Sequence, residues 1–290
     1  MWIHYDEKWF YGLVTRMAKQ CKALGLNKQQ RFAYHKNHIN KIMAIAVIGF
    51  AFEGTPENGG HGVKLAFTRC QAAKIAKKMV RAYSGKVNGS NTYRGEVIRR
   101  RGDAYMVDAN VTGSNAGTSD DRKFDLKTYF NELVLDQVED LVHPQHGQFP
   151  GYTPVMQGDK AGPHEEDEFV RWIKEECKKR KILWEPQAPQ MPHMNALDLA
   201  VFPSMSKAHS TMIRRNGKMV ASKDVIFTTA SSVWHNMPAA TIAKAFVHAW
   251  RIAEVVIRNK GSNTFLRTKE FHTNIRKDFD ETRSGVAPKQ

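Results

Sequence analysis

The stretch Met156-Gln-Gly-Asp-Lys-Ala-Gly-Pro-His164 places one acid, Asp159, between a short apolar segment and a predicted helix start. Two other acids have comparable surroundings. Asp6 follows Ile3-His-Tyr5, whose alternation is typical of a strand, and Asp198 lies in the apolar run from Asn195 to Phe202. Because an unpaired carboxylate is costly to bury, three such acids predict a site for divalent metal ions.

The residues around the three acids form motifs that occur in a fixed order. They read Asp6-Glu-Lys-Trp-Phe10, Gln157-Gly-Asp-Lys-Ala-Gly-Pro-His164 and Asn195-Ala-Leu-Asp-Leu-Ala-Val-Phe202. Together they resemble the catalytic motifs of mariner-like transposases from plants and protists, and the step from Asp159 to Asp198 is within one residue of the plant-type spacing. The resemblance extends from Trp2 to Phe202 and continues more weakly to about Lys260.

The resemblance implies a cut-and-paste reaction on DNA. Asp6, Asp159 and Asp198 would be the catalytic acids and would hold two Mg²⁺ ions, for which Mn²⁺ can substitute. Strands would be hydrolysed at the element ends, and the freed 3′-hydroxyl would be joined to target DNA. Lys160 and His164 would support the site. The implied partners are double-stranded DNA, as transposon ends and target, and a second copy in a homodimer, and the implied location is the nucleus.

This chain departs from the family motifs at two places. Lys160 stands where the family has Asn, so a cation that could contact phosphate or weaken metal binding follows Asp159. Met191-Pro-His193 replaces the usual Ser-Pro-Asp, so we predict Asp198 rather than His193 as the third ligand, because Mg²⁺ prefers carboxylate oxygen to imidazole nitrogen. We also predict that Pro203 shortens or kinks the helix carrying Asp198.

The order of predicted elements indicates an α/β fold with a ribonuclease-H-like mixed sheet flanked by helices. The predicted strands are Ile3–Tyr11, Ile42–Phe50, Val63–Phe67, a segment ending near Met156, and Ile182–Trp184. Predicted helices are Asp125–Val142, a segment from the acidic run after His164 to Lys181, and the segment carrying Asp198. Acids at strand ends and on the last helix would converge at one edge of such a sheet.

The sequence predicts a catalytic core from residue 1 to about 210, interrupted by a variable insertion at about 67–111. A helical region with a flexible basic tail follows at 211–290, and its clearest helix is Pro238–Ile257. Inside the insertion, Ala72–Tyr83 contains helix formers, whereas Tyr93–Asp108 alternates like a strand or hairpin. Thr15–Asn40 fits either a hairpin connection or a surface helix.

The composition favours an anionic partner. The 290 residues include 44 Lys and Arg against 29 Asp and Glu, which gives a formal charge of +15. Nucleic acid is the first candidate, and a basic ribosomal or membrane-surface protein is the alternative. Arg99-Arg-Arg101 and Arg214-Arg215 are candidate phosphate contacts, although a merely solvated basic face explains them equally well. The three cysteines share no short spacing, so neither a disulfide framework nor a zinc site is indicated.

Three functions compete at this point. The acid triad favours a Mg²⁺-dependent strand-transfer enzyme or its nuclease remnant. Loss of Ser-Pro-Asp favours a catalytically impaired, domesticated DNA-binding protein derived from a transposase, as does the lack of the helix-turn-helix region that the family carries ahead of its first motif. An RNA-degrading enzyme of the same fold has no specific residue in its favour.

Overall fold

The structure is a computed structural model, and it describes residues 1–12, 40–51, 61–75, 80–81, 85–87, 90–92, 97–101, 103–108, 126–158, 167–188, 191–215 and 221–261. Contacts divide the chain into two compact units. One consists of Met1–Arg69 with Leu126–Gln290, and the other of Cys70–Asp125. The predicted boundary near residue 210 stays a prediction. No helix of the described ranges is long and apolar enough to cross a membrane.

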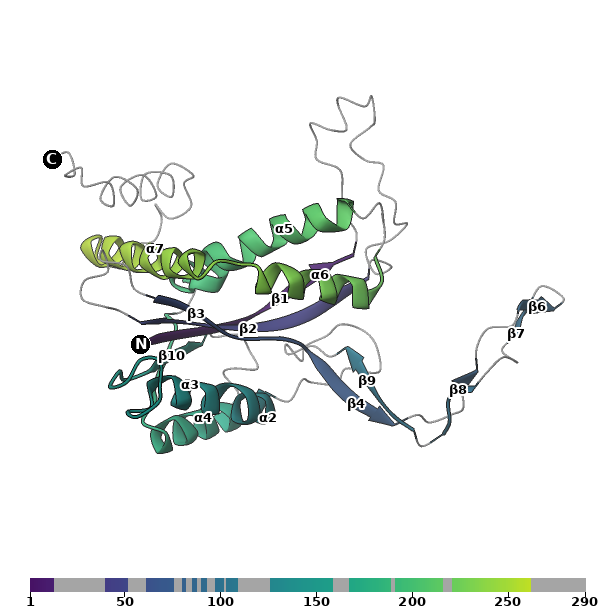
Figure 1. Ribbon diagram of the computed structural model, residues 1–290, viewed down its shortest axis with the longest axis horizontal. Helices are drawn as coiled ribbons and strands as arrows, with labels where there is room; N and C mark the ends of the chain where they lie inside the picture. The colour runs from purple at the N-terminus through teal and green to yellow at the C-terminus, as the bar shows by residue number, and fades with distance from the viewer. Residues whose placement is uncertain are drawn as a thin grey trace, which may run out of the picture. The chain divides into compact units, whose positions relative to one another are not determined.

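The first unit is built on a five-stranded mixed sheet in the order β11-β10-β1-β2-β3 (Figure 1). These strands are β1 (Trp2–Tyr11), β2 (Lys41–Ala51), β3 (His61–Arg69), β10 (Val155–Gly158) and β11 (Leu183–Pro186). β1, β2 and β3 are antiparallel neighbours, whereas β10 runs parallel to both β1 and β11. This strand order, with helices on both faces, confirms the predicted ribonuclease-H-like mixed sheet.

Two strands form the centre of the sheet. β2 is almost wholly apolar and is buried from Ile42 to Ala51, as expected of a strand covered on both faces. Successive side chains of β1 point to opposite faces of the sheet. His4 and Asp6 therefore share one face, and Tyr5 belongs to the other. The candidate site therefore begins on the His4 face.

That face is covered by the C-terminal helices (Figure 1). They are η6 (Leu197–Val201, π-helical), α5 (Phe202–Arg215), α6 (Lys223–His235) and α7 (Ala239–Arg258), and the last confirms the predicted helix near Pro238–Ile257. Phe50 stacks on Phe246 with ring centroids 5.4 Å apart. Gly62 permits close contact with α7, because a Cβ there would lie 2.4 Å from the Ala239 carbonyl oxygen.

The opposite face carries α2 (Leu126–Tyr129), η3 (Phe130–Leu135, π-helical), α3 (Asp136–Val142) and α4 (Asp167–Lys179). The first three run without a break and confirm the helix predicted at Asp125–Val142. Tyr5 packs edge-on against Phe130, with ring centroids 4.6 Å apart. An aromatic pair thus contributes to the packing on this side of the sheet.

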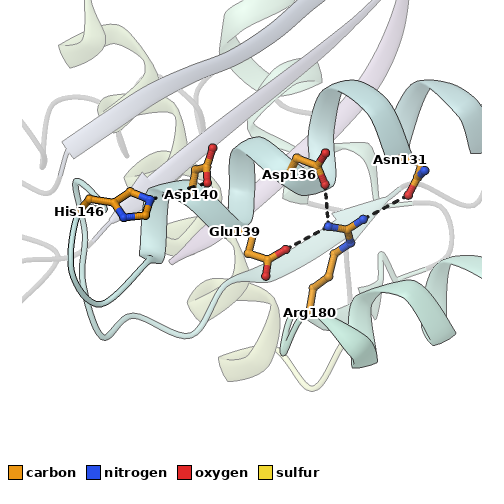
Figure 2. Close-up of polar contacts among 6 residues, drawn as sticks. All are labelled: Asn131, Asp136, Glu139, Asp140, His146 and Arg180. Carbon is orange, nitrogen blue, oxygen red and sulfur yellow. Dashed lines mark hydrogen bonds and ion pairs between the residues drawn. The ribbon is translucent and has the colours of Figure 1, made fainter.

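Arg180 joins the two helical segments of this layer (Figure 2). Its guanidinium donates to Asp136 Oδ1 at 2.6 Å, to Glu139 Oε2 at 3.0 Å and to Asn131 Oδ1 at 3.2 Å. Burial lowers the pKa of Arg180, but the bonds to Glu139 and Asp136 outweigh that effect and the net pKa is raised. Arg180 therefore remains charged and fastens the end of α4 to η3 and α3.

The second unit is described as three two-stranded antiparallel ladders. They pair β4 (Gln71–Ile75) with β9 (Ala104–Asp108), β5 (Val80–Arg81) with β8 (Val97–Arg99), and β6 (Gly85–Val87) with β7 (Ser90–Thr92). The composition of Ala72–Tyr83 indicated a helix, and this prediction is wrong for the residues of that segment that the structure describes. β4 pairs along its whole length with β9, and this pairing outweighs a weak helix propensity. Apart from Asn40, the segment Thr15–Asn40 lies outside the described residues.

Candidate active site

Asp6 lies in the middle of β1 with only 6% of its surface exposed. Its Oδ1 accepts a hydrogen bond from the Glu7 amide at 2.7 Å. The residue directly opposite on β2 is Ala46, so a small side chain neighbours the carboxylate on the same face of the sheet. The Asp6 carboxylate is consequently held at a covered position beneath the C-terminal helices.

The helix that carries Asp198 is fastened to β1 by Asn195 and His4. The Asn195 Nδ2 donates to the Tyr5 carbonyl at 3.4 Å, and the Asn195 Oδ1 accepts from the Leu197 amide at 3.0 Å. The Ala196 amide donates to His4 Nδ1 at 3.0 Å. The amides of Ala196 and Leu197, at the start of the helical run, are thus both satisfied by side chains.

A second contact with β1 lies six residues further along the chain, at Phe202. Lys8, which shares its face of β1 with Asp6, has its Nζ 5.8 Å from the centre of the Phe202 ring. On the strand, Asp6 lies between His4 and Lys8. On the helical side, Asp198 lies between Ala196 and Phe202. The strand that carries Asp6 and the helical segment that carries Asp198 therefore meet at one strand-helix junction, where Asp6 is buried and Asp198 is exposed.

The junction begins with the π-helical segment η6. The Phe202 amide donates to the Leu197 carbonyl, five residues earlier. Pro203 follows at once, and since proline has no amide hydrogen and its ring crowds the carbonyl four residues earlier, the widened turn accommodates it. The prediction was that Pro203 shortens or kinks the helix. The helical path continues to Arg215, so the helix is not shortened, and the kink stays a prediction.

β10 leads to the same junction. Ile3 pairs with Met156 and His4 with Gln157, whose Nε2 donates to the Met194 carbonyl at 3.4 Å. Gly158 ends the strand beneath Tyr5, where an added Cβ would lie 2.1 Å from the tyrosine oxygen. The predicted site residues that come next, Asp159, Lys160 and His164, lie outside the described residues.

His4 is neutral. Burial lowers its pKa to about 3, and because its Nδ1 accepts the Ala196 amide, the ring hydrogen belongs on Nε2. The ring also contacts Phe246, with centroids 4.5 Å apart. His4 and Asn195 are positioning residues that the sequence patterns did not single out. The available signals were an Asn three residues before Asp198, where a helix cap belongs, and a His two residues before Asp6.

The donor set at the junction suits a hard cation. Asp6 and Asp198 offer carboxylate oxygens, the ligands that Mg²⁺ prefers, beside a helix start. Within the described ranges, no group of three or more His, Cys, Asp and Glu side chains is placed to hold a metal ion. His193 lies in the 3₁₀ turn η5 (Pro192–Met194), ahead of the helical run that carries Asp198.

The predicted basic clusters belong to other elements of the chain. Arg100 and Arg101 belong to the second unit and are exposed. The side chain of Arg99 is not among those that the structure describes. Arg214 and Arg215 end α5, where cations also suit the helix C-terminus. Arg214 Nε donates to the Ser210 carbonyl of its own helix at 3.2 Å.

The chain was compared with family models, curated proteins and solved structures. No family model matches the chain, and no curated protein matches it in sequence. Among solved structures, it is similar to the crystal structure of the catalytic domain of Mos1 mariner transposase, with 9% identity, a TM-score of 0.44, and coverage of 90% of this chain and 83% of that one. The fold assignment itself depends on the order and direction of the five strands.

Proposed function

We propose that this chain is the catalytic core of a Mg²⁺-dependent enzyme that cleaves DNA strands and joins the resulting ends to other DNA, as transposases do. The observation that carries the proposal is the junction of β1 with η6. There the His4–Ala196 hydrogen bond and the Lys8–Phe202 contact connect the strand that carries Asp6 to the helical segment that carries Asp198. A buried carboxylate on one element, with a second acid on the element packed against it, is expected where a cation binds.

The chain's own residues have distinct roles in this proposal. Asp6 and Asp198 would hold the metal ions together with Asp159, which directly follows the last residue of β10, a strand parallel to β1. Bound divalent ions would lower the pKa of the attacking water or 3′-hydroxyl and stabilise the leaving oxygen. Lys8 would contact a phosphate oxygen beside Asp6, while His4 and Asn195 would fix the distance between strand and helix.

The test is nicking of supercoiled plasmid DNA with Mg²⁺ or Mn²⁺. Asp6→Asn, Asp159→Asn and Asp198→Asn should each lower the nicking rate about a hundredfold or more, because each removes a charged ligand. Asp140→Asn is the matched control. Asp140 is an exposed acid of α3, on the other face of the sheet, and its substitution should leave the rate unchanged.

A second readout does not depend on turnover. Mn²⁺ titrated into the full chain should release or absorb heat, and Asp198→Asn should weaken this binding more than His193→Ala. Nicking that survives all three aspartate substitutions, or that persists in a chelator, would reject the proposal. DNA binding with neither nicking nor metal binding would instead favour the domesticated DNA-binding protein.

A further inference from the structure

A pocket of about 450 Å³ lies between η6 and α5 on one side and α7 on the other. Its lining residues from η6 and α5 are Leu199, Ala200, Pro203, Ser204 and Lys207. Those from α7 are Thr241, Lys244, Ala245, His248 and Arg251. Asp198 is not among them, although it directly precedes Leu199. The pocket is therefore a neighbour of the acid junction and distinct from it.

The pocket exists because small side chains face each other across the two helices. Ala200, Pro203 and Ser204 follow helical spacing on one side, and Thr241 and Ala245 follow it on the other. Facing helices normally fill the space between them with interdigitating side chains. Here the small side chains of the two helices do not reach one another, and a pocket large enough for a small organic ligand remains.

The charges around the hollow are all of one sign. Lys207, Lys244 and Arg251 contribute three cations, and none of the described lining residues is acidic. Lys207 and Lys244 are exposed, and neither forms an ion pair with a carboxylate among the described residues. The pocket consequently combines an apolar wall, which includes Leu199 and buried Ala245, with a positive rim.

We propose that this pocket binds a nucleoside phosphate. The flat base would lie against the apolar wall beside the His248 ring, and the phosphate would be bound by Lys207, Lys244 and Arg251. Ser204 and Thr241 add hydroxyl groups that can hydrogen-bond to the base or sugar. The ligand could be a free nucleotide or one nucleotide of a single strand, since both present the same chemistry. This binding goes beyond the cleavage reaction and does not require it.

The test is calorimetric titration of the full chain with deoxyadenosine monophosphate at low salt in a chelator, so that metal binding at the acids cannot contribute. Binding should be tighter than that of inorganic phosphate or deoxyadenosine alone. Ser204→Trp, at an exposed position, should fill the hollow and abolish binding. Lys207→Ala and Lys244→Ala should each weaken binding about fivefold. Arg258→Ala, which removes an exposed cation of α7 outside the pocket, should have no effect.

Two further experiments distinguish a free nucleotide from a nucleotide of a single strand, and nucleotide binding from DNA cleavage. A photoreactive single-stranded oligothymidylate should crosslink within 199–207 or 241–251 if the ligand belongs to a strand, whereas binding of the mononucleotide without such crosslinks would identify a free nucleotide. Asp6→Asn should leave nucleotide binding intact even where it abolishes nicking. Binding no tighter than that of inorganic phosphate, or unchanged binding in a correctly folded Ser204→Trp protein, would overturn the proposal.

Discussion

At the scale of single residues, His4 links the protonation state of the chain to the geometry of the acid junction. The imidazole can accept the Ala196 amide only while Nδ1 is unprotonated. Burial enforces that state by lowering the pKa to about 3, well below the value of about 6.5 expected in the unfolded chain. The unfolded chain therefore binds more protons between these two values.

We predict that acid weakens the fold through His4. Because its pKa is lower in the folded state, its contribution to stability is complete above about pH 6.5 and is lost as the pH falls toward 3. Between pH 7 and pH 5 the free energy of unfolding should fall by about 2 kcal/mol from this residue. Urea denaturation at the two pH values measures the change.

The matched control is His4→Asn, whose side-chain oxygen can accept the Ala196 amide but does not titrate. Burial also lowers the pKa of His209, and that contribution to the pH dependence is common to both proteins. The variant should therefore lose about 2 kcal/mol less on acidification than the unsubstituted chain. Equal losses in the two proteins would show that His4 is not the linked group.

At the scale of elements, the π-helical turn η6 sets the direction of Asp198. Proline in a helix interior is less favourable than alanine by about 3 kcal/mol, so Pro203 is retained against a local cost. π segments often occur at functional sites, and this one carries a predicted ligand.

We predict opposite effects of Pro203→Ala on stability and activity. The new amide can donate to the Leu199 carbonyl, which would convert η6 to α-helix and raise the free energy of unfolding by up to about 3 kcal/mol. The same change would turn Asp198 relative to Asp6 and lower Mg²⁺-dependent nicking. Thermal melting and plasmid nicking measure the two effects.

Pro238→Ala is the control for this pair of measurements. Pro238 precedes α7 as its N-cap with extended backbone, so no helical hydrogen bond is missing there. Its substitution should change neither stability nor nicking appreciably. A Pro203→Ala protein that is stabilised and nicks at the normal rate would show that the π turn does not orient the acid.

At the scale of the whole molecule, we expect the formal charge of +15 to govern the proposed association with nucleic acid. We predict that duplex affinity falls steeply with salt, because phosphate contacts release counterions. If six phosphates are contacted, the loss between about 50 and about 200 mM salt is about a thousandfold. Fluorescence anisotropy with two unrelated labelled duplexes should give nearly equal affinities. A shallow salt dependence, or a strong preference for one duplex, would contradict this.

The sequence predicted the sheet better than it predicted the junction. The apolar run of β2 and the alternation of β1 depend on local periodicity, which a single sequence shows directly. The roles of His4 and Asn195 depend on partners about 190 residues away, which no local pattern reveals. In the second unit, the pairing of β4 with β9 likewise overrides local preference.

The hydrogen bond between Ala196 and His4 joins residues 192 positions apart in the chain. Loop closure over such a separation is slow compared with formation of the β1-β2-β3 meander, whose strands follow one another in sequence. A chain emerging during synthesis would thus complete this meander before Asp198 is available. If the chain cleaves DNA as proposed, its catalytic centre would be complete only at the end of folding, and an incomplete chain would be unable to cut DNA.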